Sequence, residues 1–117
     1  MEQVSPDFDA SEFHYYAIND SQSTDLPIKI PEQCELLVFV DHHKPLGSVK
    51  AQHLDVRENV GSTSSIYTEY LQGSDFKGDL AEETKIATAL MHGIRADTDD
   101  YVNATSLDYA ASQFLST

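Results

Sequence analysis

Carboxylate and imidazole side chains follow the two most apolar segments of the chain. Asp20 closes the first segment, and Asp41, His42 and His43 close the second within the stretch VFVDHHKPLG. Another carboxylate, Asp97, stands near the end of a helical pattern. Oxygen and nitrogen ligands of this kind suit Mn²⁺, Fe²⁺, Co²⁺ or Zn²⁺, and a carboxylate can bridge two such ions, which together activate water and hold a phosphate. These residues are therefore candidates for a metal centre that acts on phosphate.

Each of these features also has a purely structural interpretation. An aspartate at a strand end often forms a turn or a cap, and two histidines after a strand are often surface residues. The segment GIRADTDDY is compatible with a helix exit rich in turn-forming acids. The other histidines have no companions at ligand spacing, and we interpret them as structural or surface residues: His14, His53 and His92. Because adjacent residues of an extended strand point to opposite faces, we expect His42 and His43 to diverge, one towards metal and the other towards substrate or a neighbouring group.

Short apolar runs that alternate with helical patterns must position these residues. Buried strands are predicted over 14–20 and 34–41, with a weaker third strand over 52–56. Helices are predicted over 61–73, 79–98 and 105–115. The first helix would be capped by Ser62 or Thr63, and the second by a capping box of Asp79 and Glu82. The faces expected to be buried are Ile66, Tyr67, Tyr70 and Leu71; Leu80, Ile86, Leu90 and Ile94; and Leu107, Ala110, Ala111, Phe114 and Leu115.

This alternation of elements favours one fold class. Strands of near-continuous apolar character between helices indicate an α/β fold with a parallel sheet flanked by helices. In such sheets ligands bind beyond the carboxyl ends of the strands. Asp20 and the run from Asp41 to His43 stand at those ends, so we expect them to meet at one edge of the sheet.

The composition limits the classes of partner and the location. The chain has 117 residues, 20 acidic and 7 basic side chains and a formal net charge of −13. Duplex DNA is not an expected partner, since binding to it relies on a basic surface that releases counterions. No apolar run reaches the roughly 18 residues of a membrane-spanning helix. The acidic N-terminus MEQVSPDFDASEF lacks a secretion signal, and the chain has a single cysteine, Cys34, so we expect a cytoplasmic location with no membrane partner.

Four segments, in order, resemble motifs of the DHH phosphoesterase family. YYAINDSQ is similar to the second motif, a strand that ends in a metal-bridging aspartate, and VFVDHH resembles the signature that names the family. LDVRENVGSTSSIYTEYL resembles the next segment, in which a Gly-Ser/Ala-Thr-Ser run opens a helix. TALMHGIRADTDDY resembles the later motif Gly-Ile-x-x-Asp-Thr. The resemblance covers roughly residues 14–115, so 1–117 is interpreted as a partial DHH domain.

The resemblance implies hydrolysis of phosphodiester or phosphoanhydride bonds by two-metal activation of water, usually with Mn²⁺, with Mg²⁺ or Co²⁺ as alternatives. It assigns Asp20 as the bridging carboxylate, and His42 and Asp97 as ligands of the second metal. His43 resembles the histidine that faces the substrate phosphate, and Asp41 an acid that orients a neighbouring histidine. Both are thereby catalytic candidates. Ser62 and Thr63 stand at a helix N-terminus that offers donors to an anion, which makes them substrate-binding candidates.

Two parts of the family pattern are missing from the sequence. The first motif, a strand that runs into Asp-x-Asp, should lie some tens of residues before the second. PDFDA at 6–10 imitates it but follows no predicted strand and ends ten residues before Asp20, so we interpret it as a coincidence. The family's substrate-binding domain does not follow before Thr117. We therefore expect the chain as given to bind Mn²⁺ weakly and to hydrolyse little.

Three functions are compatible with these observations. The first is an Mn²⁺-dependent phosphoesterase, or the core of one, that acts on a phosphate-containing small molecule or a short single-stranded oligonucleotide. Within the family we favour a nucleotide phosphodiesterase over a pyrophosphatase. The second is a non-catalytic regulatory or interaction module that retains the DHH fold. The third is a salt-adapted α/β domain whose strand-end acids are only surface charge. The oligomeric state is open.

Overall fold

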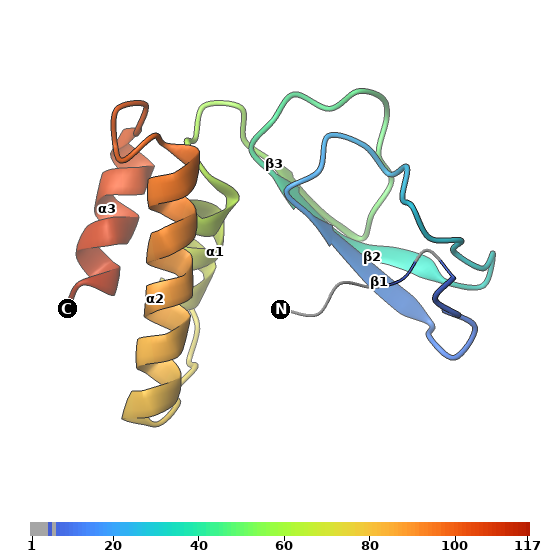
Figure 1. The fold of residues 1–117 in the computed structure, drawn as a ribbon, viewed down its shortest axis with the longest axis horizontal. Helices are drawn as coiled ribbons and strands as arrows, with labels where there is room; N and C mark the ends of the chain where they lie inside the picture. The colour runs from blue at the N-terminus through green and yellow to red at the C-terminus, as the bar shows by residue number, and fades with distance from the viewer. Residues whose placement is uncertain (1–4, 6) are drawn as a thin grey trace. The chain divides into compact units, whose positions relative to one another are not determined.

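The computed structural model describes Ser5 and residues 7–117. Three strands come first, β1 (Tyr15–Asn19), β2 (Glu35–Asp41) and β3 (His53–Val56), and three helices follow, α1 (Thr63–Gln72), α2 (Leu80–Asp97) and α3 (Ser106–Leu115) (Figure 1). Every predicted strand and helix is present, with its ends within two residues of the prediction. Both strand pairs are parallel. The predicted α/β fold with a parallel sheet is confirmed.

The N-terminal predictions fall partly outside the described residues. The segment expected to lack a secretion signal includes residues 1–4 and 6, which the structure does not describe. Asp7 to Ala10, the described part of the Asp-x-Asp-like segment, form a turn and irregular chain. None of the helices in the described part of the chain has the length and apolar character needed to cross a membrane.

The chain forms two compact units, one that ends at Val56 and one that runs from Arg57 to Thr117. The single partial domain expected over 1–117 thus contains two units. Their positions relative to one another are not determined, and each unit is described by itself (Figure 1).

The first unit contains the sheet, with strand order β1-β2-β3. The register of β1 against β2 is irregular between Tyr16 and Ala17, where β2 has the extra residue Leu37. Such a bulge shifts the paired strand by one residue and changes which side chains face each other. Beyond it, Asn19 pairs with Val40. The carboxyl ends of β1 and β2 therefore lie side by side.

Burial in this sheet is concentrated at the end of β2, where Phe39, Val40 and Asp41 are buried. The prediction of a buried strand is wrong for most of β1, since only Ile18 is buried there and Tyr15 is 56% exposed. β1 is an edge strand of the described sheet, with a neighbour on one side only.

The second unit consists of three helices that contact one another, and its core is largely polar. Ile66, Ile94 and Ala111 are buried together with the polar side chains Ser62, Thr63, Ser65, Thr68, Thr98, Asp108 and Ser112. The predicted apolar faces are only partly buried. Leu80 is 80% exposed, and Ala111 alone is fully buried among the residues predicted for α3.

Asp108 explains this polar core. Its buried carboxylate accepts hydrogen bonds from the Gly61 amide (2.9 Å), the Ser65 hydroxyl (2.5 Å), and the amide and hydroxyl of Thr105 (2.7 and 2.8 Å). Helix N-termini stabilise negative charge because their amides are not paired within the helix. One carboxylate therefore ties the start of α1 to the start of α3. Apolar periodicity gives no signal for such a residue, so the sequence patterns do not predict it.

Two predicted helix caps are confirmed. Ser62 is the N-cap of α1, and its hydroxyl accepts a hydrogen bond from the Ser65 amide at 3.1 Å. Asp79 caps α2 in a capping box, in which the Glu82 amide donates to Asp79 at 2.8 Å and the Asp79 amide donates to the Glu82 carboxylate at 3.3 Å.

Substitution of Gly61 by alanine tests this packing. A methyl group at Gly61 would overlap the Asp108 carboxylate and lie 2.7 Å from the Thr98 methyl carbon. Since neither buried neighbour can move freely, we expect Gly61→Ala to lower the free energy of unfolding by about 1–3 kcal/mol. Urea denaturation followed by far-UV circular dichroism measures the change. Gly47→Ala is the control, because nothing lies within 4 Å of its added carbon. Equal stability of the two variants would contradict the close approach at Gly61.

Candidate metal centre

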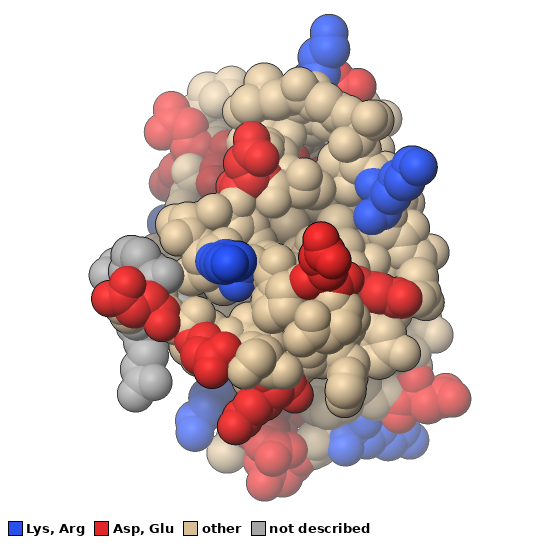
Figure 2. All heavy atoms as spheres, turned by 90° about the vertical axis from the view of Figure 1, so that its right-hand side faces the viewer, with Lys and Arg blue, Asp and Glu red and all other residues tan. Residues whose placement is uncertain are grey.

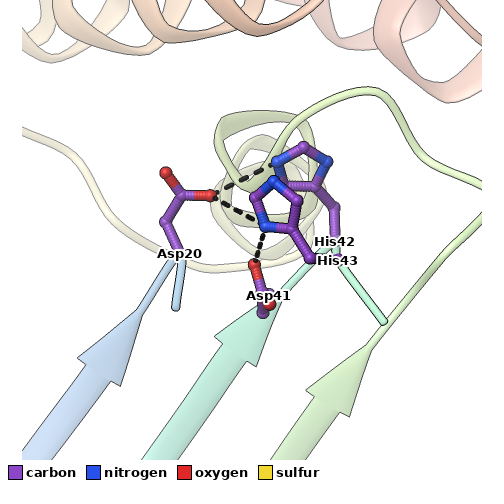
Figure 3. A group of neighbouring side chains, drawn as sticks. All are labelled: Asp20, Asp41, His42 and His43. Carbon is purple, nitrogen blue, oxygen red and sulfur yellow. Dashed lines mark hydrogen bonds and ion pairs between the residues drawn. The ribbon is translucent and has the colours of Figure 1, made fainter. Parts of the chain in front are cut away.

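Four side chains gather at the carboxyl edge of the sheet: Asp20, Asp41, His42 and His43 (Figure 3). Each offers one ligand atom, and these atoms all lie within 4.8 Å of one another. They come from the ends of two adjacent parallel strands, so the strand pairing itself brings them together. This group, called the Asp-His cluster below, contains two carboxylates and two imidazoles.

Asp20 reaches the cluster through an unusual backbone conformation. Its φ angle is 59°, in the left-handed region, which aspartate and asparagine adopt more readily than most residues do. Its amide donates a hydrogen bond to the Val40 carbonyl at 2.9 Å, which fixes the chain at the end of β1. The Asp20 Oδ1 atom then lies 3.3 Å from His42 Nε2 and 3.8 Å from His43 Nδ1. One carboxylate oxygen thus faces both imidazoles.

Asp41 is the last residue of β2, and its side chain is completely buried. Its Oδ1 atom lies 2.9 Å from His43 Nδ1. Its Oδ2 atom is also buried and has no hydrogen-bond partner among the described residues. A buried carboxylate with an unsatisfied oxygen is costly, and such groups call for a compensating ion or water. An ion or a water molecule beside this atom would supply the missing partner.

The two histidines do not diverge, and the expectation that they would is wrong. Their ring centroids are 4.0 Å apart, with the ring planes at 44°, and both rings face Asp20 (Figure 3). β2 ends at Asp41 and the chain bends at His42 and His43, so the alternation of an extended strand no longer applies. The two side chains differ in access instead, since that of His42 is 11% exposed and that of His43 is 42% exposed.

The other predicted site residues belong to the second unit. Asp97 is the exposed last residue of α2, whereas Ser62 and Thr63 are buried at the start of α1. Ser62 is engaged as the helix cap, and its hydroxyl lies 3.1 Å from that of Ser65. Since the two units are not placed relative to one another, the roles of Asp97, Ser62 and Thr63 in this centre stay predictions.

The acids after Asp97 form a turn, as one interpretation of GIRADTDDY expected. Asp99, Asp100 and Tyr101 all have positive φ angles, of 52°, 53° and 73°. The Tyr101 amide donates to the Thr98 hydroxyl at 3.0 Å, and Arg95 donates to Asp100 at 2.8 Å. The hydrogen bond to Asp100 raises the pKa of the Arg95 guanidinium. Left-handed residues in sequence are unfavourable, so these contacts are needed to hold the turn.

Comparisons with known proteins found a related sequence and a similar fold. No protein-family model matches the chain. The uncharacterized protein MJ1633 of Methanocaldococcus jannaschii is 37% identical over 111 residues, which make up 93% of this chain and 22% of that protein. The chain thus spans about a fifth of the length of this curated relative.

A crystal structure of a Methanococcus jannaschii protein described as a family II inorganic pyrophosphatase has a similar fold. The TM-score is 0.66 at 21% sequence identity, and the match covers 87% of this chain and 36% of that chain. At this identity the similarity shows a shared α/β architecture.

Proposed function

We propose that the chain belongs to the DHH phosphoesterase family and serves in metal-dependent hydrolysis of phosphoester or phosphoanhydride bonds. The observation that carries the proposal is the Asp-His cluster, with a buried Asp41 oxygen that has no hydrogen-bond partner among the described residues. The ordered motifs in the sequence support it. So does the fold similarity to a protein described as a pyrophosphatase, since the family that the motifs resemble includes family II pyrophosphatases.

The residues of the cluster fit a divalent metal. Two imidazole nitrogens and two carboxylate oxygens form a donor set that suits Mn²⁺ and related ions, including Co²⁺, whereas Mg²⁺ favours oxygen ligands alone. Asp20 and His42 would hold the ion, because Asp20 Oδ1 and His42 Nε2 already lie 3.3 Å apart. A bound ion would polarise a phosphoryl oxygen and lower the pKa of water, which is the chemistry that phosphoester hydrolysis needs.

The remaining two residues of the cluster divide the other tasks. Asp41, held rigidly at the end of β2, orients the His43 ring through its contact with Nδ1. His43 is the more exposed imidazole, so its Nε2 atom is the one available to a substrate. When protonated at both nitrogens, His43 donates one N–H to Asp41 and the other to a phosphate oxygen. It thereby stabilises the charge that develops during hydrolysis.

The charge of the protein supports a small or single-stranded phosphate as the proposed substrate. The net charge is −13, and on the face drawn in Figure 2 the Lys and Arg side chains do not gather into one patch. A duplex would require such a basic surface. A small anion requires only that bound cations reverse the field locally. We therefore propose a phosphate-containing small molecule or a short single-stranded oligonucleotide as substrate, and Asp97 as a further ligand from the second unit.

Metal binding should depend on His42. Replacement of this ligand by alanine is expected to weaken Mn²⁺ binding at least about tenfold, a loss as large as that seen when groups around a metal site are removed. Isothermal titration calorimetry with Mn²⁺ measures the effect. Asp20→Asn should also weaken binding, and it keeps a residue type that tolerates the left-handed backbone. His14→Ala, an exposed histidine outside the cluster, is the matched control. Equal affinity of His42→Ala and His14→Ala would rule out this centre.

Hydrolysis should require the same residues. With Mn²⁺ we expect slow release of nitrophenol from bis(p-nitrophenyl) phosphate, abolished by a chelator and lowered at least about tenfold in kcat by His43→Gln, in line with the usual contribution of a positioned acid or base. Phosphate release from pyrophosphate, assayed in parallel, separates phosphodiester from phosphoanhydride preference.

Three outcomes separate the candidate functions. Turnover that persists in His42→Ala would contradict the proposed mechanism. Mn²⁺ binding that depends on His42 without any turnover would favour the non-catalytic module. No metal binding at all would favour the interpretation of the strand-end acids as surface charge.

A further inference from the structure

We infer that the Asp-His cluster can close completely around one four-coordinate ion, with Zn²⁺ as the preferred occupant, and that this closed form is a resting state. In it Asp41 and His43 become direct metal ligands beside Asp20 and His42. The four protein ligands then leave no position for water or phosphate. The closed site concerns the cluster alone, and only its inhibitory effect rests on the proposed function.

The spacing of the ligand atoms supports closure. Ligands placed about 2.0–2.1 Å from Zn²⁺ at the corners of a tetrahedron lie about 3.3 Å from one another. The corresponding separations here are 2.9 Å between His43 and Asp41, 3.3 Å between His42 and Asp20, and 3.8 Å between His43 and Asp20. All four ligand atoms lie within 4.8 Å of one another. Small side-chain rotations are sufficient to bring them onto one ion.

Charge also favours a closed site. Two carboxylates and two neutral imidazoles around a divalent cation form a group with no net charge. Such a group lowers the cost of burying the Asp41 carboxylate, whose side chain is completely buried, because the ion compensates its charge. An ion held by Asp20 and His42 alone would leave the buried Asp41 carboxylate without a direct bond to a cation.

Closure requires one proton to change position. His43 faces Asp41 with Nδ1, at 2.9 Å, so Nδ1 is the atom that would reach the ion. A nitrogen atom that binds a metal cannot also carry a proton. The proton of the neutral His43 ring therefore moves to Nε2. The 42% exposure of this side chain gives solvent access for that exchange.

The preferred geometry of each ion then decides which form is populated. Zn²⁺ sites with four protein ligands are closed and structural, whereas catalytic sites keep an open position. Mn²⁺ favours six ligands in octahedral geometry and retains water. The same cluster would be open with Mn²⁺ and closed with Zn²⁺, so Zn²⁺ is expected to inhibit hydrolysis that Mn²⁺ supports.

Co²⁺ is the probe for this proposal, because four-coordinate Co²⁺ absorbs visible light strongly and six-coordinate Co²⁺ only faintly. We expect the full chain to give intense visible bands with one equivalent of Co²⁺, and Zn²⁺ to remove them by displacement. Asp41→Asn and His43→Gln should each reduce the bands to the faint level, whereas His14→Ala should leave them unchanged. Because Asp41 is buried, far-UV circular dichroism is needed to check that the Asp41→Asn protein folds. His43 is half-exposed, so His43→Gln provides a variant that does not disturb the core.

The outcomes separate this inference from the proposed function. Faint bands with bound Co²⁺, or intense bands that survive in His43→Gln, would overturn the closed site, whatever the Mn²⁺-dependent activity. Intense bands in a protein without hydrolytic activity would support the closed site and remove the proposed function. Hydrolysis that runs equally fast with Zn²⁺ and Mn²⁺ would show that closure does not regulate the centre and would contradict the resting state.

Discussion

The hydrogen bond from the Asp20 amide to the Val40 carbonyl fixes the position of Asp20 at the end of β1. The candidate centre depends on this position. The hydrogen bond continues the parallel pairing of β1 and β2 past the last paired residues, so that Asp20 lies beside Asp41. The bulge at Leu37 sets this register, because it offsets the two strands by one residue. A shift of one residue would send alternate side chains to the other face of the sheet. The Asp-His cluster is thus a consequence of strand register.

Two buried carboxylates differ in how completely they are hydrogen-bonded. Asp108 accepts four hydrogen bonds at the starts of α1 and α3, and these donors stabilise its negative charge. Asp41 is equally buried, but one of its oxygens has no hydrogen-bond partner among the described residues. Because its hydrogen bonds are complete, Asp108 has a structural role that joins α1 to α3. Asp41 keeps one oxygen without a partner in the described part of the chain, and its place in the metal centre is the proposal made above.

The acidic character of the chain is consistent with a proposed metal centre that binds phosphate through cations. A net charge of −13 repels phosphate at long range, so any phosphate chemistry needs cations at the centre. The cluster brings together two carboxylates and two imidazoles, a donor set that would bind a divalent ion. In the second unit, two glycines permit close packing. Gly61 lets the Asp108 side chain approach the backbone, and Gly93 does the same for Ser64.

Local sequence patterns determined the elements and their ends. The strands, the helices, the caps at Ser62 and Asp79, and the acids at the strand ends all depend on neighbouring residues, so they could be predicted from the chain alone. The parallel sheet followed from the alternation of strands with helical patterns.

Only the tertiary structure decided how these elements meet. The bend that brings His42 and His43 together, the bulge at Leu37 and the role of Asp108 depend on contacts between distant residues, and hydrophobic periodicity does not encode them. The same holds for Leu80, which lies on a predicted apolar stripe but is exposed because the buried contacts of α2 are concentrated near Ile94 and Thr98. Periodicity identifies which face of a helix is apolar, whereas burial depends on what packs against it.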